Sequence, residues 1–121
     1  MAKKILVVDD EPDILKIVTF RLKKLRCDIL TADNGKDALD LIRRQRPDLV
    51  LLDLRLPIID GYEVCKQVKA DDELKNIPII LLTASSTAKI SEKTKEFKAD
   101  GYIIKPFDPE ELLKKVKKFI E

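Results

Sequence analysis

Five short apolar runs are the feature that most restricts the fold of this chain. Four of them are continuous rather than alternating and lie at residues 5–8, 49–52, 79–82 and, shorter, 102–104. A weaker run lies at residues 29–32 and includes Thr31. Strands that are buried on both faces read as continuous apolar runs, whereas strands with one solvated face alternate between apolar and polar residues. The runs therefore predict a parallel sheet that is covered by helices on both faces.

Helical patterns fill the segments between the runs. The last helix opens with the sequence DPEE, in which Asp108 is the expected cap and Pro109 takes the first helical position. A first helix is expected after Pro12, and its predicted buried stripe is Ile14, Leu15, Ile17, Val18, Leu22 and Leu25. Residues 88–97 are poor in large apolar side chains, so we expect this helix to be the most loosely held. Five strand–helix units predict a doubly wound α/β sandwich.

Composition limits the chemistry of the chain. With 121 residues and no linker or repeat, we expect a single domain spanning residues 1–121. The net charge of +2 indicates no nucleic-acid partner, and neither a membrane span nor a signal peptide is visible. We expect a cytoplasmic protein in which Cys27 and Cys65 are reduced packing residues. The chain has no histidine, which excludes histidine bases and imidazole metal ligands.

Polar side chains follow four of the runs at the point where each run ends: Asp9 and Asp10, Asp53, Thr83, and Lys105. Taken singly, each is most simply a turn or cap residue. In open α/β sheets, however, ligands bind at the carboxyl ends of the strands. Three carboxylates, a hydroxyl and a lysine at four strand ends therefore predict one site.

The expected chemistry of this site is phosphoryl transfer. Two carboxylates 4 Å apart repel by about 4 kcal/mol at a protein-surface dielectric, and a bound cation relieves this repulsion. Oxygen ligands favour Mg²⁺, which bridges carboxylates to phosphate oxygens. An aspartate can then act as a nucleophile toward phosphorus, while a lysine neutralises the phosphoryl oxygens.

Four motifs resemble the receiver domains of two-component response regulators, including the chemotaxis receiver. They are VVDD (7–10), LLDLRLPIIDG (51–61), LLTAS (81–85) and YIIKPF (102–107), and the resemblance covers the whole chain. It implies a flavodoxin-like fold, with a doubly wound parallel sheet of five strands in the order 2-1-3-4-5 and five helices. It also implies a phosphorylation-controlled signalling switch in a two-component system or phosphorelay.

The resemblance implies a role for each site residue. Asp53 corresponds to the phosphoacceptor. Asp10 and Asp53 would ligate Mg²⁺ through their carboxylates and Arg55 through its backbone carbonyl, with Asp9 acting mainly through metal-bound water. Mn²⁺ is expected to substitute for Mg²⁺.

The remaining motif residues match the phosphoryl-binding and switch positions. Thr83, Ala84 and Lys105 would bind the phosphoryl group, and Thr83 with Tyr102 would form the hydroxyl–aromatic switch. The bond between Lys105 and Pro106 is expected to be cis. The output surface would comprise the fourth helix, the fifth strand and the last helix.

The implied donor is a phosphohistidine on a separate histidine kinase or histidine phosphotransferase. The chain would act as a signalling protein rather than an enzyme, although it catalyses its own phosphorylation and dephosphorylation. We expect a monomer or a weak phosphorylation-dependent dimer, with no membrane or nucleic-acid contact. The sequence names no downstream effector.

Two other functions fit parts of the pattern. An aspartyl-phosphate phosphohydrolase would usually carry a second aspartate two residues after the first, where this chain has Arg55. A receiver-like binding module that never accepts phosphate usually loses an acidic residue or the lysine, and this chain keeps them all. The sequence also departs from the family at Arg26 and Lys98, where glycine is common, so we expect left-handed backbone there.

Overall fold

Five parallel strands form one sheet in the order β2-β1-β3-β4-β5, as the resemblance implies. The computed structural model describes residues 2–84 and 87–121. Its strands are β1 (Lys4–Val8), β2 (Asp28–Ala32), β3 (Leu49–Asp53), β4 (Ile79–Thr83) and β5 (Gly101–Ile104). Every neighbouring pair is parallel. All five strands therefore present their carboxyl ends at the same edge of the sheet.

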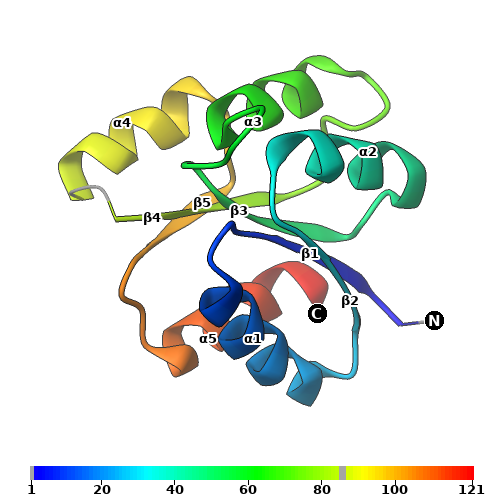
Figure 1. Ribbon diagram of the computed structural model, residues 1–121, viewed down its shortest axis with the longest axis vertical. Helices are drawn as coiled ribbons and strands as arrows, with labels where there is room; N and C mark the ends of the chain where they lie inside the picture. Colours follow the sequence, from blue (N-terminus) through cyan, green and yellow to red (C-terminus); the bar gives the residue numbers. More distant parts are fainter. Residues whose placement is uncertain (1, 85–86) are drawn as a thin grey trace.

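Five α-helices cover both faces of this sheet (Figure 1). They are α1 (Pro12–Leu22), α2 (Gly35–Gln45), α3 (Gly61–Ala70), α4 (Thr87–Glu96) and α5 (Pro109–Ile120), and the 3-10 helix η1 (Lys23–Leu25) follows α1. Helices α2, α3 and α4 lie on one face, and α1 and α5 lie on the other. The expected cap of α5 is present, because the Asp108 side chain accepts a hydrogen bond from the backbone N–H of Glu110.

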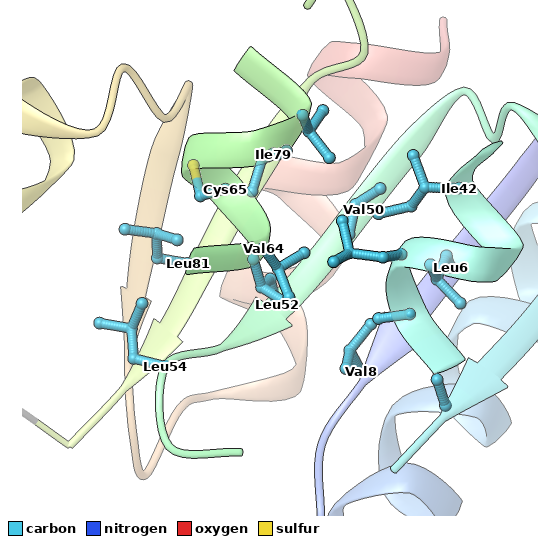
Figure 2. Close-up of a cluster of buried hydrophobic side chains, with 14 of the residues drawn as sticks. Leu6, Val8, Ile42, Val50, Leu52, Leu54, Val64, Cys65, Ile79 and Leu81 are labelled. Atoms are coloured by element: carbon cyan, nitrogen blue, oxygen red, sulfur yellow. The ribbon is translucent and has the colours of Figure 1, made fainter. Parts of the chain in front are cut away.

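The central strands are apolar throughout because alternate residues enter two different cores. Leu6, Val50 and Leu81 point into the core beneath α2 and α3, which Figure 2 shows. Their neighbours along the strands, such as Leu51 and Leu82, enter the second core beneath α1 and α5. Burial on both faces thus explains the continuous apolar runs.

Helix α1 corrects one expectation from the sequence. Val18 and Leu22 are fully buried, as predicted, but the Ile17 side chain is 47% exposed. Phe20, which lies outside the predicted stripe, is 65% exposed. Each residue turns a helix by about 100°, so Ile17 lies beside the buried face defined by Val18 and Leu22 rather than on it. The helix consequently presents two large apolar side chains to solvent.

The backbone is left-handed at both positions where the sequence departs from the family pattern. Arg26 has a φ of 54° and Lys98 a φ of 59°. Arg46 and Ile58 are also left-handed, with φ values of 45° and 71°, and the sequence analysis did not predict these two. Ile58 is the most strained of the four because a β-branched side chain crowds this conformation.

Helix α4 is weakly anchored in the part of it that the structure describes. Of its described side chains, only that of Ile90 is buried. Phe97, just beyond the helix, packs against Tyr62 with ring centroids 4.7 Å apart. These contacts agree with the sparse apolar pattern of residues 88–97. Separately, no helix among the described residues combines the length and apolar character of a membrane span.

Candidate functional site

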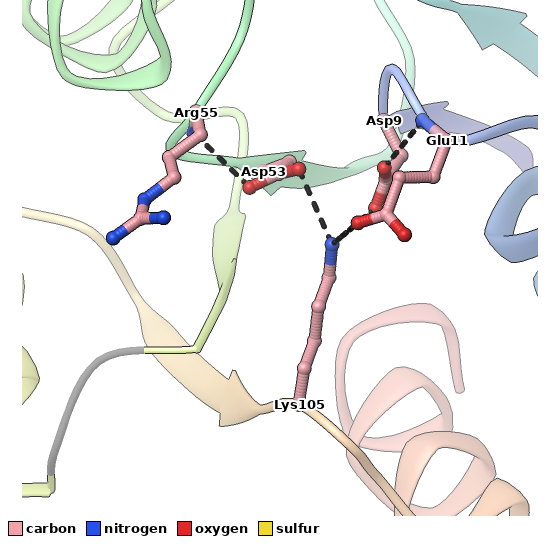
Figure 3. Close-up of polar contacts among 5 residues, drawn as sticks. All are labelled: Asp9, Glu11, Asp53, Arg55 and Lys105. Carbon is pink, nitrogen blue, oxygen red and sulfur yellow. Dashed lines mark hydrogen bonds and ion pairs between the residues drawn. The ribbon is translucent and has the colours of Figure 1, made fainter.

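Lys105 links the ends of three strands at the carboxyl edge of the sheet. Its Nζ atom lies 2.6 Å from Oδ2 of Asp9, 3.2 Å from Oδ2 of Asp53 and 3.6 Å from Oε1 of Glu11 (Figure 3). The Lys105 N–H also donates to the backbone carbonyl of Thr83, at 2.7 Å. Side chains and backbone from β1, β3, β4 and β5 therefore meet at one point, as the sequence predicted.

An open cavity of about 250 Å³ lies beside this lysine. It is lined by Asp10, Glu11, Asp53, Arg55, Thr83, Ala84 and Lys105. Asp9 is fully buried and does not line the cavity. Tyr102 does not line it, and its nearest charged contact is with Lys115 of α5. The cavity is large enough for a phosphoryl group.

Asp9, Asp53 and Thr83 are the buried polar residues of the described chain. Asp9 accepts a hydrogen bond from the backbone N–H of Glu11 at 2.9 Å, and Asp53 accepts one from that of Arg55 at 3.1 Å. The loops after β1 and β3 thus fold back so that each N–H meets the carboxylate two residues earlier. These bonds hold both carboxylates in fixed orientations.

Charge coupling within the cluster shifts two pKa values. Burial raises the pKa of Asp53, and the negative charge of Asp9 raises it further. The hydrogen bond from the Arg55 N–H and the positive charge of Lys105 lower this pKa, but by less, so it stays above its ordinary value. Burial alone would lower the pKa of Lys105, but its hydrogen bond to Asp9 and the charges of Asp53 and Asp9 outweigh burial and raise it. Lys105 is therefore firmly cationic at neutral pH.

Gly61 allows the loop after β3 to close against the site. A Cβ atom at this position would lie 2.2 Å from the carbonyl oxygen of Asp53 and 2.7 Å from the Cα of Leu54. The Gly61 N–H donates to the Leu54 carbonyl at 3.0 Å, and the Asp60 side chain caps α3 by accepting from the Glu63 N–H. A side chain at position 61 would push α3 away from Asp53.

The carboxylates fit a hard divalent cation. Asp9, Asp10, Glu11 and Asp53 each offer one oxygen, and these four oxygens lie within 4.8 Å of one another. An all-oxygen donor set is what Mg²⁺ prefers, and the neighbouring cavity leaves space for its waters. Glu11 was not among the predicted site residues, although its position directly after the acidic pair was a usable signal. The proposed role of the Arg55 carbonyl remains a prediction.

Two further expectations concern the backbone near the site. The bond between Lys105 and Pro106 is cis, as the resemblance implied. Ser85, the last residue of the LLTAS motif, lies outside the described residues.

The chain matches the family described as response regulator receiver domain over residues 5–117 and belongs to it. Among solved structures, it is similar to the chemotaxis response regulator CheY4 of Vibrio cholerae, with 31% identity, a TM-score of 0.91, and coverage of 98% of this chain and 99% of that one. This class of protein is the receiver of two-component signalling.

Two other solved structures are receiver domains, one with magnesium in its active-site cleft and one described as BeF3-activated. The receiver domain of the sensor histidine kinase PA1611 of Pseudomonas aeruginosa, with magnesium in its active-site cleft, is 30% identical over 99% of this chain and 98% of that one, with a TM-score of 0.89. The BeF3-activated receiver of DrrB, a Thermotoga maritima protein, is 39% identical over 98% of this chain and 97% of that one, with a TM-score of 0.87. The present chain is accordingly a signalling receiver with an acidic cluster at its active site.

Proposed function

We propose that Asp53 accepts a phosphoryl group from a phosphohistidine of a separate histidine kinase or phosphotransferase, in a reaction that depends on Mg²⁺. The observation that carries this proposal is the position of Lys105, whose ammonium lies 3.2 Å from Asp53 at the edge of an open cavity. A phosphoryl group on Asp53 would enter that cavity and meet a fixed positive charge.

In the proposed reaction, a carboxylate oxygen of Asp53 forms a bond to phosphorus while the bond from phosphorus to the donor imidazole nitrogen breaks. The departing nitrogen keeps the electron pair of that bond. The backbone N–H of Arg55 orients the Asp53 carboxylate, and Lys105 stabilises negative charge on the phosphoryl oxygens. A magnesium ion bound by the acidic cluster would supply further neutralisation of those oxygens. Mn²⁺ is the expected substitute.

An exposed apolar surface beside the site supports docking of a donor protein. A groove of about 160 Å³ is lined by Ile14, Ile17, Lys105, Pro106 and Phe107. Lys105 belongs to both this groove and the site cavity, so the two adjoin. A donor that packs on the exposed Ile17 and Phe20 of α1 would bring its phosphohistidine to Asp53. The phosphohistidine must come from another protein, because this chain has no histidine.

The proposed output is a shift between two states of the surface formed by α4, β5 and α5. A phosphoryl group on Asp53 would attract the Thr83 hydroxyl and change the space available to Tyr102, and the weakly anchored α4 would follow at little cost. We further propose a single domain over residues 1–121, a cytoplasmic location, and a monomer or weak phosphorylation-dependent dimer. The effector is an unidentified protein or domain.

The rival functions have less support. Arg55 occupies the position at which a phosphohydrolase of this chemistry carries its second acid. A binding module that never accepts phosphate would not require Lys105 beside Asp53 at the edge of an open cavity.

Intact-mass spectrometry after incubation with acetyl phosphate tests the proposal. One added phosphoryl group is expected with Mg²⁺, none in EDTA, and none in Asp53→Asn. Asp60→Asn, which changes the nearby cap of α3, is the matched control and should still be labelled. Equal labelling of Asp53→Asn and the parent would reject the site.

A further inference from the structure

Lys115 differs from the other lysines of α5. Lys114, Lys117 and Lys118 are exposed, whereas Lys115 is half-buried. Its Nζ atom lies 5.1 Å from the centroid of the Tyr102 ring and donates a hydrogen bond to the backbone carbonyl of Tyr102. One side chain of α5 therefore holds both the ring and the backbone of Tyr102.

The contacts between Lys115 and Tyr102 lie at the edge of the sheet. β5 is the last strand in the sheet order. The Tyr102 ring packs with the core on the α2–α4 face, whereas the buried side of α5 belongs to the opposite core. The Lys115 side chain thus spans from one face to the other across the free side of β5. It connects α5 to a ring that packs on the opposite face of the sheet.

No competing partner draws Lys115 away from the ring. Asp100, which directly precedes β5, accepts hydrogen bonds from Lys69 at 2.9 Å and from the Ile79 N–H at 2.8 Å. Within residues 2–84 and 87–121, no carboxylate lies at ion-pair distance from Lys115. The ammonium is free to make a cation–π contact, which strengthens as the cation is desolvated.

We propose that Lys115 is a positioning residue for Tyr102, that it holds the ring where this structure places it, and that phosphorylation of Asp53 favours a different ring position. This inference rests on the proposed function, because it assigns a regulatory contact to the same switch. Movement of the Tyr102 ring after phosphorylation requires this contact to break or to follow the ring. By linkage, a contact that favours the unphosphorylated state weakens the binding of a phosphoryl group or its mimic.

The test uses the two tyrosines, Tyr62 and Tyr102, as probes, because the chain has no others. With ¹³C-labelled tyrosine, NMR spectra contain two sets of ring signals, and Tyr62→Phe assigns them. Lys115→Met removes the charge but keeps the length of the side chain, and Lys115→Arg keeps the charge. Lys114→Met is the control on an exposed lysine of the same helix, and Lys115→Gln is the second charge-removing variant if Lys115→Met does not fold.

Lys115→Met should shift the Tyr102 ring signals and leave those of Tyr62 unchanged. It should also lower the beryllofluoride concentration at which half of the protein is in the bound form, by about two- to fivefold. This change is the one expected from loss of a partly exposed cation–π contact. Lys115→Arg should behave like the parent, as should Lys114→Met. Parent-like Tyr102 signals and a parent-like beryllofluoride concentration for half-binding in Lys115→Met would overturn the inference.

The two proposals fail in different ways. If the parent does not respond to beryllofluoride in the presence of Mg²⁺, the proposed function at Asp53 is wrong, and so is the coupling to it. The Tyr102 ring signals of the free proteins still decide whether Lys115 positions the ring, since that measurement needs no phosphoryl mimic.

Discussion

The ammonium of Lys105 lies closer to Asp9 than to Asp53, at 2.6 Å against 3.2 Å. Asp9 is fully buried, so its carboxylate depends on this partner and on the Glu11 N–H for the interactions that water would otherwise provide. Lys105 therefore has a structural role in addition to the proposed phosphoryl contact. It supplies positive charge to an acidic cluster whose oxygens fit a divalent metal ion.

Replacing Lys105 with methionine should destabilise the fold by about 3 kcal/mol, because it leaves the buried Asp9 carboxylate without its cation. Urea unfolding in EDTA measures this loss. Mg²⁺ should recover part of it, since the ion supplies positive charge to the same carboxylates. Lys118→Met, on the exposed side of α5, should change stability by less than about 0.5 kcal/mol. Equal losses in the two variants would contradict a specific role for Lys105.

Replacing Asp10 with asparagine should stabilise the metal-free protein. The exposed Asp10 shares the acidic cluster with Asp9, Glu11 and Asp53, and removing one charge should relieve about 1 kcal/mol of repulsion. Thermal unfolding in EDTA should show a higher midpoint, and the advantage should shrink in Mg²⁺ because the variant binds the ion more weakly. Asp40→Asn, at an exposed pair with Arg44, is the control and should gain nothing. A less stable Asp10→Asn in EDTA would mean that the carboxylates are not a strained ion site.

Replacing Phe20 with serine should slow phosphoryl transfer from protein donors but not from small-molecule donors. If α1 docks the donor, transfer from a phosphorylated histidine kinase or phosphotransferase should slow by about tenfold, equivalent to about 1.4 kcal/mol of lost contact. Labelling by acetyl phosphate should be unchanged, since Phe20 lies outside the site cavity. Ile58→Ser removes another exposed apolar side chain, but in the loop after β3, and should have a much smaller effect. A parent-like transfer rate in Phe20→Ser would exclude this docking surface.

Cys65 should make stability fall as the solution becomes alkaline. Burial raises the pKa of its thiol from the ordinary 9.0 to about 11. Between these values the unfolded chain loses the thiol proton while the folded chain retains it, so stability decreases as pH rises through this window. Urea midpoints from pH 8 to 10.5 should therefore fall less steeply for Cys65→Ala than for the parent, although the variant starts lower because it loses packing. Parallel pH profiles would show that Cys65 does not contribute.

Much of the fold follows from local sequence. The apolar runs of the central strands and the Asp108 cap reflect interactions among residues close in the chain, and these expectations agree with the structure. The left-handed backbone at Arg26 and Lys98 was expected from the family resemblance and is also present. The edge strand β2 is only partly buried, so its run was wrongly expected to be covered on both faces. The polar residues at the strand ends could also be assigned to one site. Parallel strands bring their carboxyl ends to the same edge, whatever the details of packing.

Only the tertiary structure determined how side chains from distant segments are placed at the carboxyl edge of the sheet and on the surrounding surface. Helical periodicity could not show that Ile17 is exposed, because burial depends on how α1 is rotated against the sheet. Glu11 joins the acidic cluster, and Lys105 lies nearer Asp9 than Asp53, because the loops after β1 and β3 fold back at particular angles. The contact between Lys115 and Tyr102 likewise requires α5 to lie beside the last strand. Local pattern specifies elements and their order, whereas these contacts depend on the relative placement of elements, which only packing of the whole core determines.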